Sequence, residues 1–516
     1  LSYKDFLSIL SNSNPNFSSD KDPEWFKILK SVFNNNCDID ITDNDIDSLE
    51  RKKAPFFNIT IPFLKWSKNY VINQLNVFKN NFKHFPILEN NLLPSILQPV
   101  YQNLLSLSCQ TLILELNIKR IHQELIGSTK EDRFNYFISN YITEPNDILT
   151  LLKKYPVLGR LMVTSMKNIV HSRLEALKHY LNDYNELQNK FGGNFTELIS
   201  IKGNVGDVHN SGRSVLIFSF VSGEKLVYKP RSLAIDQHFQ EFLSWINNKG
   251  INPQFKTMKV LDRTTYGWQE YIETEECKNV EAVKRFYKRQ GGYLAISYLL
   301  NATDFHSENI IASGEHPFFI DLESLFQNRL PIDTNENASQ IASTKLMNSV
   351  LRTGLLPVSL FKSNFLQGIE ISGLGGYKGQ AIPKSVYGFV DVGTDEMRME
   401  KKQFYLEEGK NRPIMNGKAI RSEEYIGEIV EGFRNLYKLF IDFREELLSE
   451  NGPISLFKND QVRAIIRHTQ SYGSMLEAGM HPKNLKDGLM RVQLFDFMWR
   501  IVKQIPKMSL VVSSEH

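Results

Sequence analysis

The period of the hydrophobic pattern changes near Gly192, and this change constrains the fold more than any other feature of the chain. Before it, apolar residues recur at i, i+3, i+4 and i+7, as in residues 92–127 and 155–187, which predicts long amphipathic helices. After it, residues 192–232 are rich in β-branched side chains and glycine-containing turns, which predicts three or four short antiparallel strands. The fold class is therefore predicted to be α+β.

The ends of several elements can also be predicted. The helix in residues 92–127 should end at Gly127, and Ser128 and Glu131 should form the capping box of the next helix. A helix in residues 235–250 should close at its final glycine, and residues 256–272 should form a hairpin. Helical patterns return in residues 279–301 and after 422.

These patterns divide the chain into four parts. We predict an N-terminal helical region, a β-rich part, a helical part and a glycine-rich insertion, spanning residues 1–192, 193–275, 276–348 with 421–516, and 349–420.

Charge and cysteine content exclude several classes of protein. With 61 Lys and Arg against 58 Asp and Glu, the net charge is +3, so the basic surface of a nucleic-acid-binding protein is not expected. Three cysteines without CxxC spacing argue against disulfides and against a cysteine zinc site, and fit a cytoplasmic location. The longest apolar run, residues 104–117, is too short and too polar to cross a membrane, so we interpret it as part of a buried helix.

Residues 301–326 concentrate polar residue types that phosphoryl transfer requires. Asp304 is followed five positions later by Asn309, the spacing of a kinase catalytic loop, and a short strand then leads to Asp321. Upstream, Lys229 ends an apolar strand, where a phosphate-pairing lysine belongs. The order resembles that of a two-lobed kinase.

A purely structural interpretation is also open for each residue. Asp304 and Asn309 could cap short turns, and Lys229 could be a solvated strand end. Taken singly, each residue favours that interpretation, but it predicts no ordered spacing across a hundred residues. We therefore prefer the functional interpretation for the set.

A second group of polar residues does not fit a plain kinase. Asp207 and His209 lie on the turn that would cover the phosphates, with Arg213 beside them. Near the C-terminus, Arg463 and Thr469 are predicted to lie on a helical segment. For these two the structural alternatives are a surface cation and a hydroxyl bonded to its own helix backbone. The functional alternative is an anion-binding set that acts on a phosphorylated product.

Several motifs together resemble the dehydratase portion of the class II, LanM-type lanthipeptide synthetases. They are GDVHNSGRSV, LVYKPR, LLNATDFHSENIIA, FFIDLESLF, VRAIIRHTQSYGSML and HPKNLKDGLMRVQLFDFMWR. The resemblance extends over most of residues 90–516. It implies an enzyme that phosphorylates Ser and Thr of a ribosomal precursor peptide, leader and core, with ATP and Mg²⁺. The enzyme then eliminates the phosphate to leave dehydroalanine or dehydrobutyrine.

The resemblance also implies a fold and a role for each matching position. The fold is a lipid-kinase-like catalytic core with an N-terminal helical region and an inserted β-rich activation subdomain. The phosphorylation set comprises Asp304, His306, Asn309 and Asp321. The elimination set comprises Asp207, His209, Lys229, Arg463 and Thr469. We add Arg231 and Glu323 to these, Glu323 as a metal ligand with Asn309 and Asp321, while Lys229 is expected to serve the ATP phosphates as well.

Other expectations follow from the same resemblance. The family usually continues into a zinc-dependent cyclase domain, but this chain stops at residue 516, so neither zinc nor thioether ring formation is expected of it. A membrane-bound export machinery is a further expected partner, although the chain itself should not span the membrane. Two alternative functions are a kinase-like phosphotransferase without elimination and a non-catalytic scaffold that binds a peptide.

Overall fold

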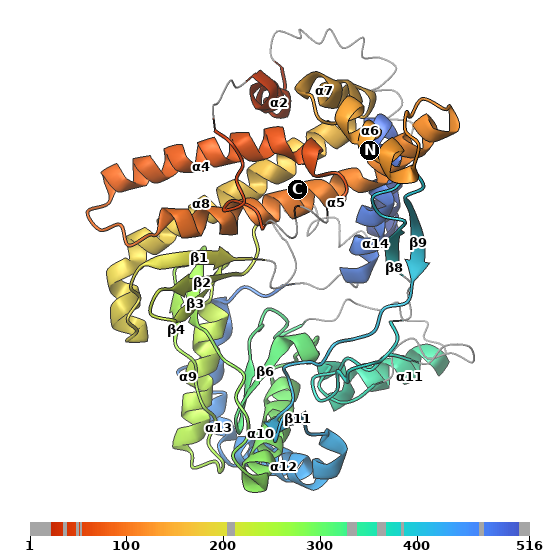
Figure 1. The fold of residues 1–516 in the computed structure, drawn as a ribbon. Helices are drawn as coiled ribbons and strands as arrows, with labels where there is room; N and C mark the ends of the chain where they lie inside the picture. Colours follow the sequence, from red (N-terminus) through yellow and green to blue (C-terminus); the bar gives the residue numbers. More distant parts are fainter. Residues whose placement is uncertain are drawn as a thin grey trace.

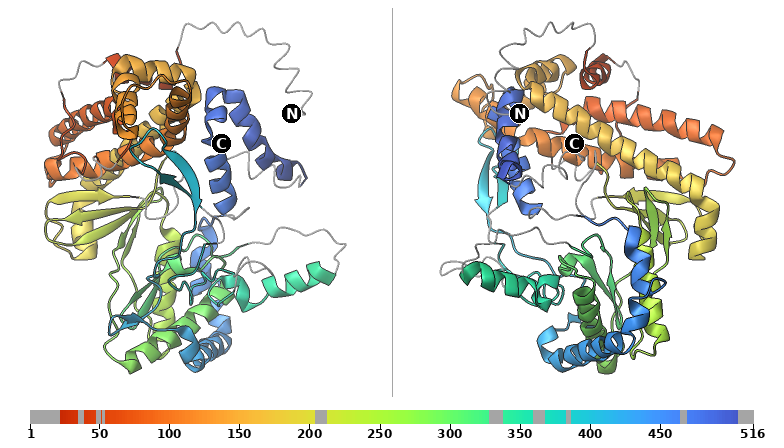
Figure 2. Two further views of the ribbon diagram at one scale, coloured as in Figure 1. Left: turned by 45° about the vertical axis from the view of Figure 1, so that its right-hand side comes forward. Right: turned by 180° about the vertical axis from the view of Figure 1, so that it is seen from behind.

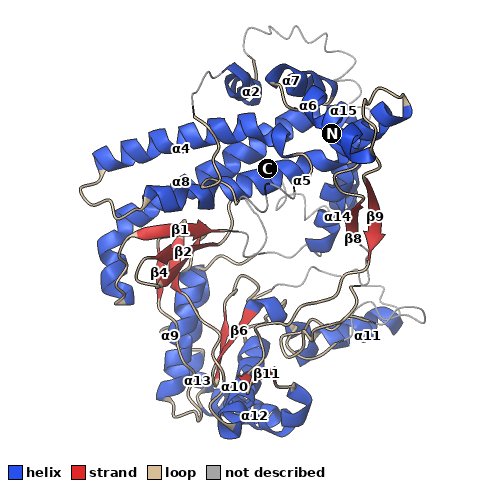
Figure 3. Ribbon diagram, viewed as in Figure 1, coloured by secondary structure: helices blue, strands red, loops and turns tan. Residues whose placement is uncertain are grey.

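The computed structural model describes residues 22–34, 39–47, 51, 54–203, 212–327, 338–358, 368–382, 386–463 and 469–504. In these residues helices predominate and the strands form small antiparallel sheets (Figure 3). The predicted α+β class is confirmed at this level. Nothing in the described helices is long and apolar enough for a membrane span.

Long helices of the N-terminal region pack side by side at one end of the molecule (Figure 1). The helices are α2 (Glu24–Asn34), η1 (Phe57–Thr60), α4 (Ile61–Asn81), α5 (Glu89–Ile121), α6 (Lys130–Tyr141), α7 (Pro145–Lys154) and α8 (Pro156–Phe191). Their apolar faces share one core, in which Leu64, Leu104 and Leu177 are fully buried. The predicted apolar run at residues 104–117 lies inside α5, so the prediction of a buried helix is confirmed.

The predicted boundary between α5 and α6 is wrong by several residues. The helix α5 ends at Ile121 rather than Gly127, because Gln123 adopts a left-handed φ of 59°. The next amide, that of Glu124, donates back to the Lys119 carbonyl at 3.0 Å, which closes the helix end. The capping box exists but is formed by Thr129 and Asp132, one residue later than predicted.

The region after Gly192 forms one five-stranded antiparallel sheet in the order β1-β2-β3-β5-β4. Its strands are β1 (Leu198–Lys202), β2 (Leu216–Phe220), β3 (Lys225–Lys229), β4 (Val260–Asp262) and β5 (Gly267–Glu270). The predicted short strands and the hairpin are therefore confirmed. The helix α8 packs against the sheet through Tyr180, whose ring contacts Phe218, Phe220 and Trp268.

The second helical body lies beyond this sheet (Figure 1). It contains α9 (Ala234–Asn248), α10 (Val280–Leu299), η2 (Ser307–Asn309), β6 (Ile310–Ser313), β7 (His316–Phe319), η3 (Val350–Thr353), η4 (Ser422–Tyr425), α12 (Ile426–Asp442), α13 (Arg444–Leu447) and η5 (Pro453–Asn459). The helices α10 and α12 cross closely, because Gly291 faces the Ile429 carbonyl and Gly432 faces the Lys288 carbonyl.

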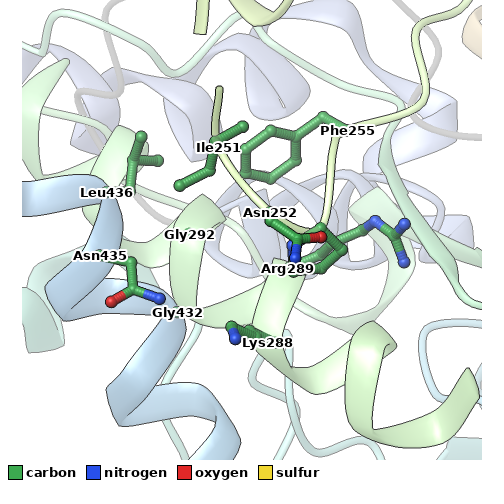
Figure 4. A pocket seen from close by; sticks show the side chains of 10 residues that line it. Ile251, Asn252, Phe255, Lys288, Arg289, Gly292, Gly432, Asn435 and Leu436 are labelled. Carbon is green, nitrogen blue, oxygen red and sulfur yellow. The ribbon is translucent and has the colours of Figure 1, made fainter. Parts of the chain in front are cut away.

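A pocket lies beside this crossing (Figure 4). Its lining comes from α10, α12 and the loop after α9, and includes Phe255, Lys288, Arg289, Gly292 and Asn435. None of the predicted site residues lines it.

The inserted segment contains short elements, as predicted, and its hairpin is anchored to the N-terminal helices. Its strands are β8 (Val386–Val390), β9 (Arg398–Lys402), β10 (Ile414–Met415) and β11 (Lys418–Ala419), and α11 (Ala338–Met347) lies just before residue 349. The β8–β9 hairpin reaches up to the helical region (Figure 1). At its turn the fully buried Asp395 carboxylate accepts a hydrogen bond of 2.6 Å from Arg133 on α6.

The last described elements are α14 (Thr469–Gly479), α15 (Pro482–Lys486) and α16 (Gly488–Gln504). Figure 2 shows α14 and α16 beside the N-terminal region. The prediction that Arg463 lies on a helical segment is wrong. Arg463 is in an irregular stretch after η5, because its backbone groups bond to the loop of residues 323–327 instead of within a helix.

Candidate functional site

Lys229 is the last residue of β3, and its side chain is directed into the protein. Only 5% of the residue is exposed. Its ammonium donates hydrogen bonds to Asp236 Oδ1 at 3.1 Å and to the Ile320 carbonyl at 2.6 Å. The interpretation of Lys229 as a solvated strand end is therefore wrong. A buried ammonium requires such partners, since an unpaired buried charge is strongly destabilising.

Asp236 is the buried acceptor at the centre of this group. It lies in the first turn of α9, and its other oxygen accepts a hydrogen bond of 2.7 Å from Arg231. Burial by itself raises the pKa of Asp236. Arg231 and Lys229 lower this pKa by more than burial raises it, so it lies below its usual value. Asp236 is therefore an ionised carboxylate between two cations.

Arg231 extends the same group towards the predicted metal loop. Its guanidinium pairs with Glu323 and lies 3.6 Å from Asp321 Oδ1. Burial lowers the pKa of Arg231, but the surrounding carboxylates of Asp236, Glu323 and Asp321 raise it more, so the net shift is upwards. Arg231 therefore stays charged and joins α9 to residues 321–323.

The predicted catalytic loop is a compact polar turn. The Asn309 amide donates to the Asp304 carbonyl at 2.9 Å, and His306 Nε2 lies 3.4 Å from the same amide nitrogen. His306 Nδ1 accepts the Glu308 backbone N–H at 3.3 Å and so caps η2. Asp304 has a left-handed φ of 66°, and its side chain is 54% exposed. The loop thus leaves a carboxylate open to solvent.

The two predicted loops lie against each other. The Ile320 amide donates to the Asn309 carbonyl at 3.0 Å, which sets Asp321 beside the end of the catalytic loop. On the other side, the Thr303 amide donates to the Ser324 carbonyl at 3.1 Å. Beneath them, the buried ring of Phe305 stacks on Phe319 at 4.3 Å. Asp304, Asn309 and Asp321 therefore lie on two loops that adjoin each other.

Asn309 and Asp321 are suitable ligands for a magnesium ion. Mg²⁺ binds hard oxygen atoms and retains several waters, so two protein oxygens suffice. Among the described residues, neither Asn309 Oδ1 nor Asp321 Oδ2 accepts a hydrogen bond. Glu323 differs, because one of its oxygens pairs with Arg231. Within the described ranges, no cluster of three or more His, Cys, Asp or Glu side chains is suited to a metal. A magnesium site made of one amide and one carboxylate does not require such a cluster.

The elimination residues are only partly placed. Asp207 and His209 lie outside the described residues, and of Thr469 only its position at the start of α14 is described. Arg213 makes two hydrogen bonds to Glu175 at 2.8 and 2.9 Å. Arg463 is exposed, and its amide donates to the Glu323 carbonyl at 2.9 Å. The structure therefore joins Arg463 to the loop that carries Asp321.

Sequence reasoning missed two polar residues of this site. Asp236 resembles any acidic residue in the first turn of a helix, where it would favour the helix dipole. Its position seven residues after Lys229 was the available signal. Gln327, whose amide donates to the Arg463 carbonyl at 2.6 Å, gave no signal at all.

Comparison with known sequences identifies the family. The chain belongs to the family described as "Domain of unknown function (DUF4135)", which matches residues 155–516. The chain is also homologous to the lacticin 481/lactococcin biosynthesis protein LcnDR2 of Lactococcus lactis subsp. lactis. The two are 28% identical over 425 residues, which is 78% of this chain and 44% of that protein. The predicted resemblance to LanM-type proteins is thus confirmed, and the chain spans less than half the length of this relative.

Proposed function

We propose that the chain dehydrates Ser and Thr residues of a precursor peptide in lanthipeptide biosynthesis, by phosphorylation followed by elimination of phosphate. One observation carries the proposal: the backbone of Arg463 is bonded to Glu323, two residues from Asp321. An arginine suited to binding a leaving phosphate therefore adjoins a loop suited to phosphoryl transfer. The homology to a lacticin 481 biosynthesis protein supports the same assignment.

In the first step the peptide hydroxyl attacks the terminal phosphorus of ATP, and the bond from that phosphorus to the bridging oxygen of ADP breaks. Asp304, with its exposed carboxylate, orients the hydroxyl and accepts its proton. Asn309 and Asp321 would hold Mg²⁺, which neutralises charge on the phosphates when bound. Lys229 and Arg231 supply fixed positive charge from the buried group around Asp236. In this proposal, the sheet and the second helical body form the two lobes of a lipid-kinase-like catalytic core.

In the second step a base removes the Cα proton of the phosphorylated residue. The electron pair forms the Cα–Cβ double bond, and the Cβ–O bond breaks to release phosphate. Arg463 and Lys229 stabilise the departing phosphate, Arg463 by two parallel hydrogen bonds. Asp207, His209 and Thr469 complete the elimination set in this proposal, and either Asp207 or His209 could serve as the base.

Mass spectrometry of a co-expressed precursor peptide tests the proposal, beginning with the lacticin 481 precursor. Asp321→Ala should leave the peptide unmodified, whereas Arg463→Ala should accumulate phosphopeptide. Arg434→Ala, which removes an exposed arginine of α12, is the matched control and should dehydrate the peptide normally. Unmodified peptide from Arg463→Ala would refute the division between the two steps. Phosphopeptide from the unaltered chain would instead favour a phosphotransferase without elimination.

A further inference from the structure

The stretch from Phe457 to Arg463 lies between α9 and the loop of Asp321. Near its start, η5 packs on α9 (Figure 2), and the ring of His238 meets Phe457 edge-on. His238 Nδ1 lies 2.8 and 3.0 Å from the two oxygens of Asp460, whose side chain is only 4% exposed. A carboxylate can only accept, so Nδ1 carries the proton and donates to it.

The other end of this stretch is fixed through the backbone of Arg463. Its amide donates to the Glu323 carbonyl at 2.9 Å, and its carbonyl accepts from the Gln327 side chain at 2.6 Å. The backbone N–H of Gln327 in turn donates to the Asn301 carbonyl at 3.1 Å. Both backbone groups of Arg463 are therefore held, while its side chain remains exposed for an anion.

The helix α9 serves two parts of the site from opposite sides. Asp236 and His238 are two residues apart, so their side chains leave the helix about 200° apart. Asp236 holds Lys229 and Arg231, whereas His238 holds Asp460. The helix α9 therefore contacts both the group that holds Lys229 and the start of the stretch that leads to Arg463.

We infer that the His238–Asp460 hydrogen bond and Gln327 are positioning groups for phosphate elimination. They fix the backbone of Arg463 beside the loop that carries Asp321, so that its exposed side chain can reach a phosphate bound at that loop. This inference rests on the proposed function, because it assigns Arg463 to the elimination step. Phosphorylation should be little affected, since the Thr303–Ser324 and Asn309–Ile320 bonds that hold the catalytic loop remain intact.

Two substitutions and two measurements test the inference. His238→Ala and Gln327→Ala each remove one attachment of the stretch, and Lys249→Ala, which removes an ion pair with Glu446 at the far end of α9, is the matched control. Hydrogen exchange of residues 457–463 should become faster in both test variants and stay unchanged in the control. Elimination should slow about tenfold, so that phosphopeptide accumulates while total phosphorylation is retained.

The outcomes separate the inference from the proposed function. Hydrogen exchange is measured on the protein alone, without substrate. Unchanged exchange at residues 457–463 in the two variants would overturn the positioning role. Faster exchange with normal dehydration would show that holding Arg463 does not matter for elimination. If Arg463→Ala itself yields no phosphopeptide, the proposed role of Arg463 fails instead. Because Gln327 is partly exposed, its variant should fold even if His238→Ala does not.

Discussion

The Lys229 ammonium lies 3.1 Å from Asp236 Oδ1, and both side chains are almost completely buried. Asp236 also accepts from Arg231 at 2.7 Å, so this carboxylate contacts both cations, while Arg231 pairs with Glu323 as well. This relationship explains how two positive charges can be kept inside the protein beside the candidate phosphate site. It also makes Asp236 the residue on which the geometry of both cations depends.

Asp236→Asn should therefore destabilise the protein and abolish phosphorylation. Removing one partner of a buried ion pair typically costs about 3–5 kcal/mol, because the remaining charges are left uncompensated. Urea denaturation measures the loss of stability, and mass spectrometry of the peptide measures the loss of modification. Asp442→Asn, at an exposed position at the end of α12, should change neither. A stable, active Asp236→Asn protein would contradict the assignment.

Substitutions of Asp304 should separate backbone strain from catalysis. Its φ of 66° is left-handed, a conformation that Asn and Gly adopt more readily than Ala. Asp304→Ala should therefore be less stable than Asp304→Asn or Asp304→Gly by about 1 kcal/mol. All three should lose phosphorylation, since none retains the carboxylate. Denaturation curves give the order of stability, and phosphorylation by Asp304→Asn would exclude Asp304 as the proton acceptor.

The sequence predicted the elements, and the closeness of the loops that carry Asp304 and Asp321, better than the contacts around them. The regular periodicities of α8 and of β1 to β3 were sufficient, because each element's own side chains determine them. Likewise Asp304, Asn309 and Asp321 lie on neighbouring turns of one short β-hairpin unit, so local spacing was informative.

The long-range contacts could not be predicted in the same way. Nothing in the sequence near Arg463 indicates that its carbonyl bonds to Gln327, 136 residues earlier. A helix was predicted there, but the amide of Arg463 bonds to the Glu323 carbonyl and not to a carbonyl of the preceding helical turn. The end of α5 was missed for a different reason, since Gln123 takes a left-handed conformation that glycine usually supplies.

Stability should fall in mildly acidic solution because of His316. Burial, followed by the nearby Arg289, lowers the pKa of His316 from 6.5 to about 4. In this range the unfolded chain binds a proton that the native protein does not, so the free energy of unfolding decreases as pH falls from about 6.5 towards 4. The contribution of His316 to this loss should be about 1–2 kcal/mol at pH 5.

Urea denaturation of His316→Gln at several pH values isolates this contribution. The variant lacks the titrating imidazole, so its stability should depend less steeply on pH between about 6.5 and 4 than that of the unaltered protein. His122→Gln removes an imidazole that is 64% exposed and is the matched control, with an unchanged slope expected. Parallel curves for His316→Gln and the unaltered protein would contradict a lowered pKa of the half-buried His316.

The crossing of α10 and α12 should tolerate no side chain at Gly432. A Cβ built there would lie 1.8 Å from the Lys288 carbonyl oxygen, and backbone of a packed helix cannot move aside as a flexible side chain can. Gly432→Ala should therefore lower the free energy of unfolding by about 3 kcal/mol or more. Gly427→Ala, in the same helix, is the matched control, because a Cβ there meets nothing within 4 Å. It should raise stability by up to about 1 kcal/mol through its better helix propensity. Thermal unfolding of the two variants compares them directly, and equal effects would show that the two helices do not cross at Gly432.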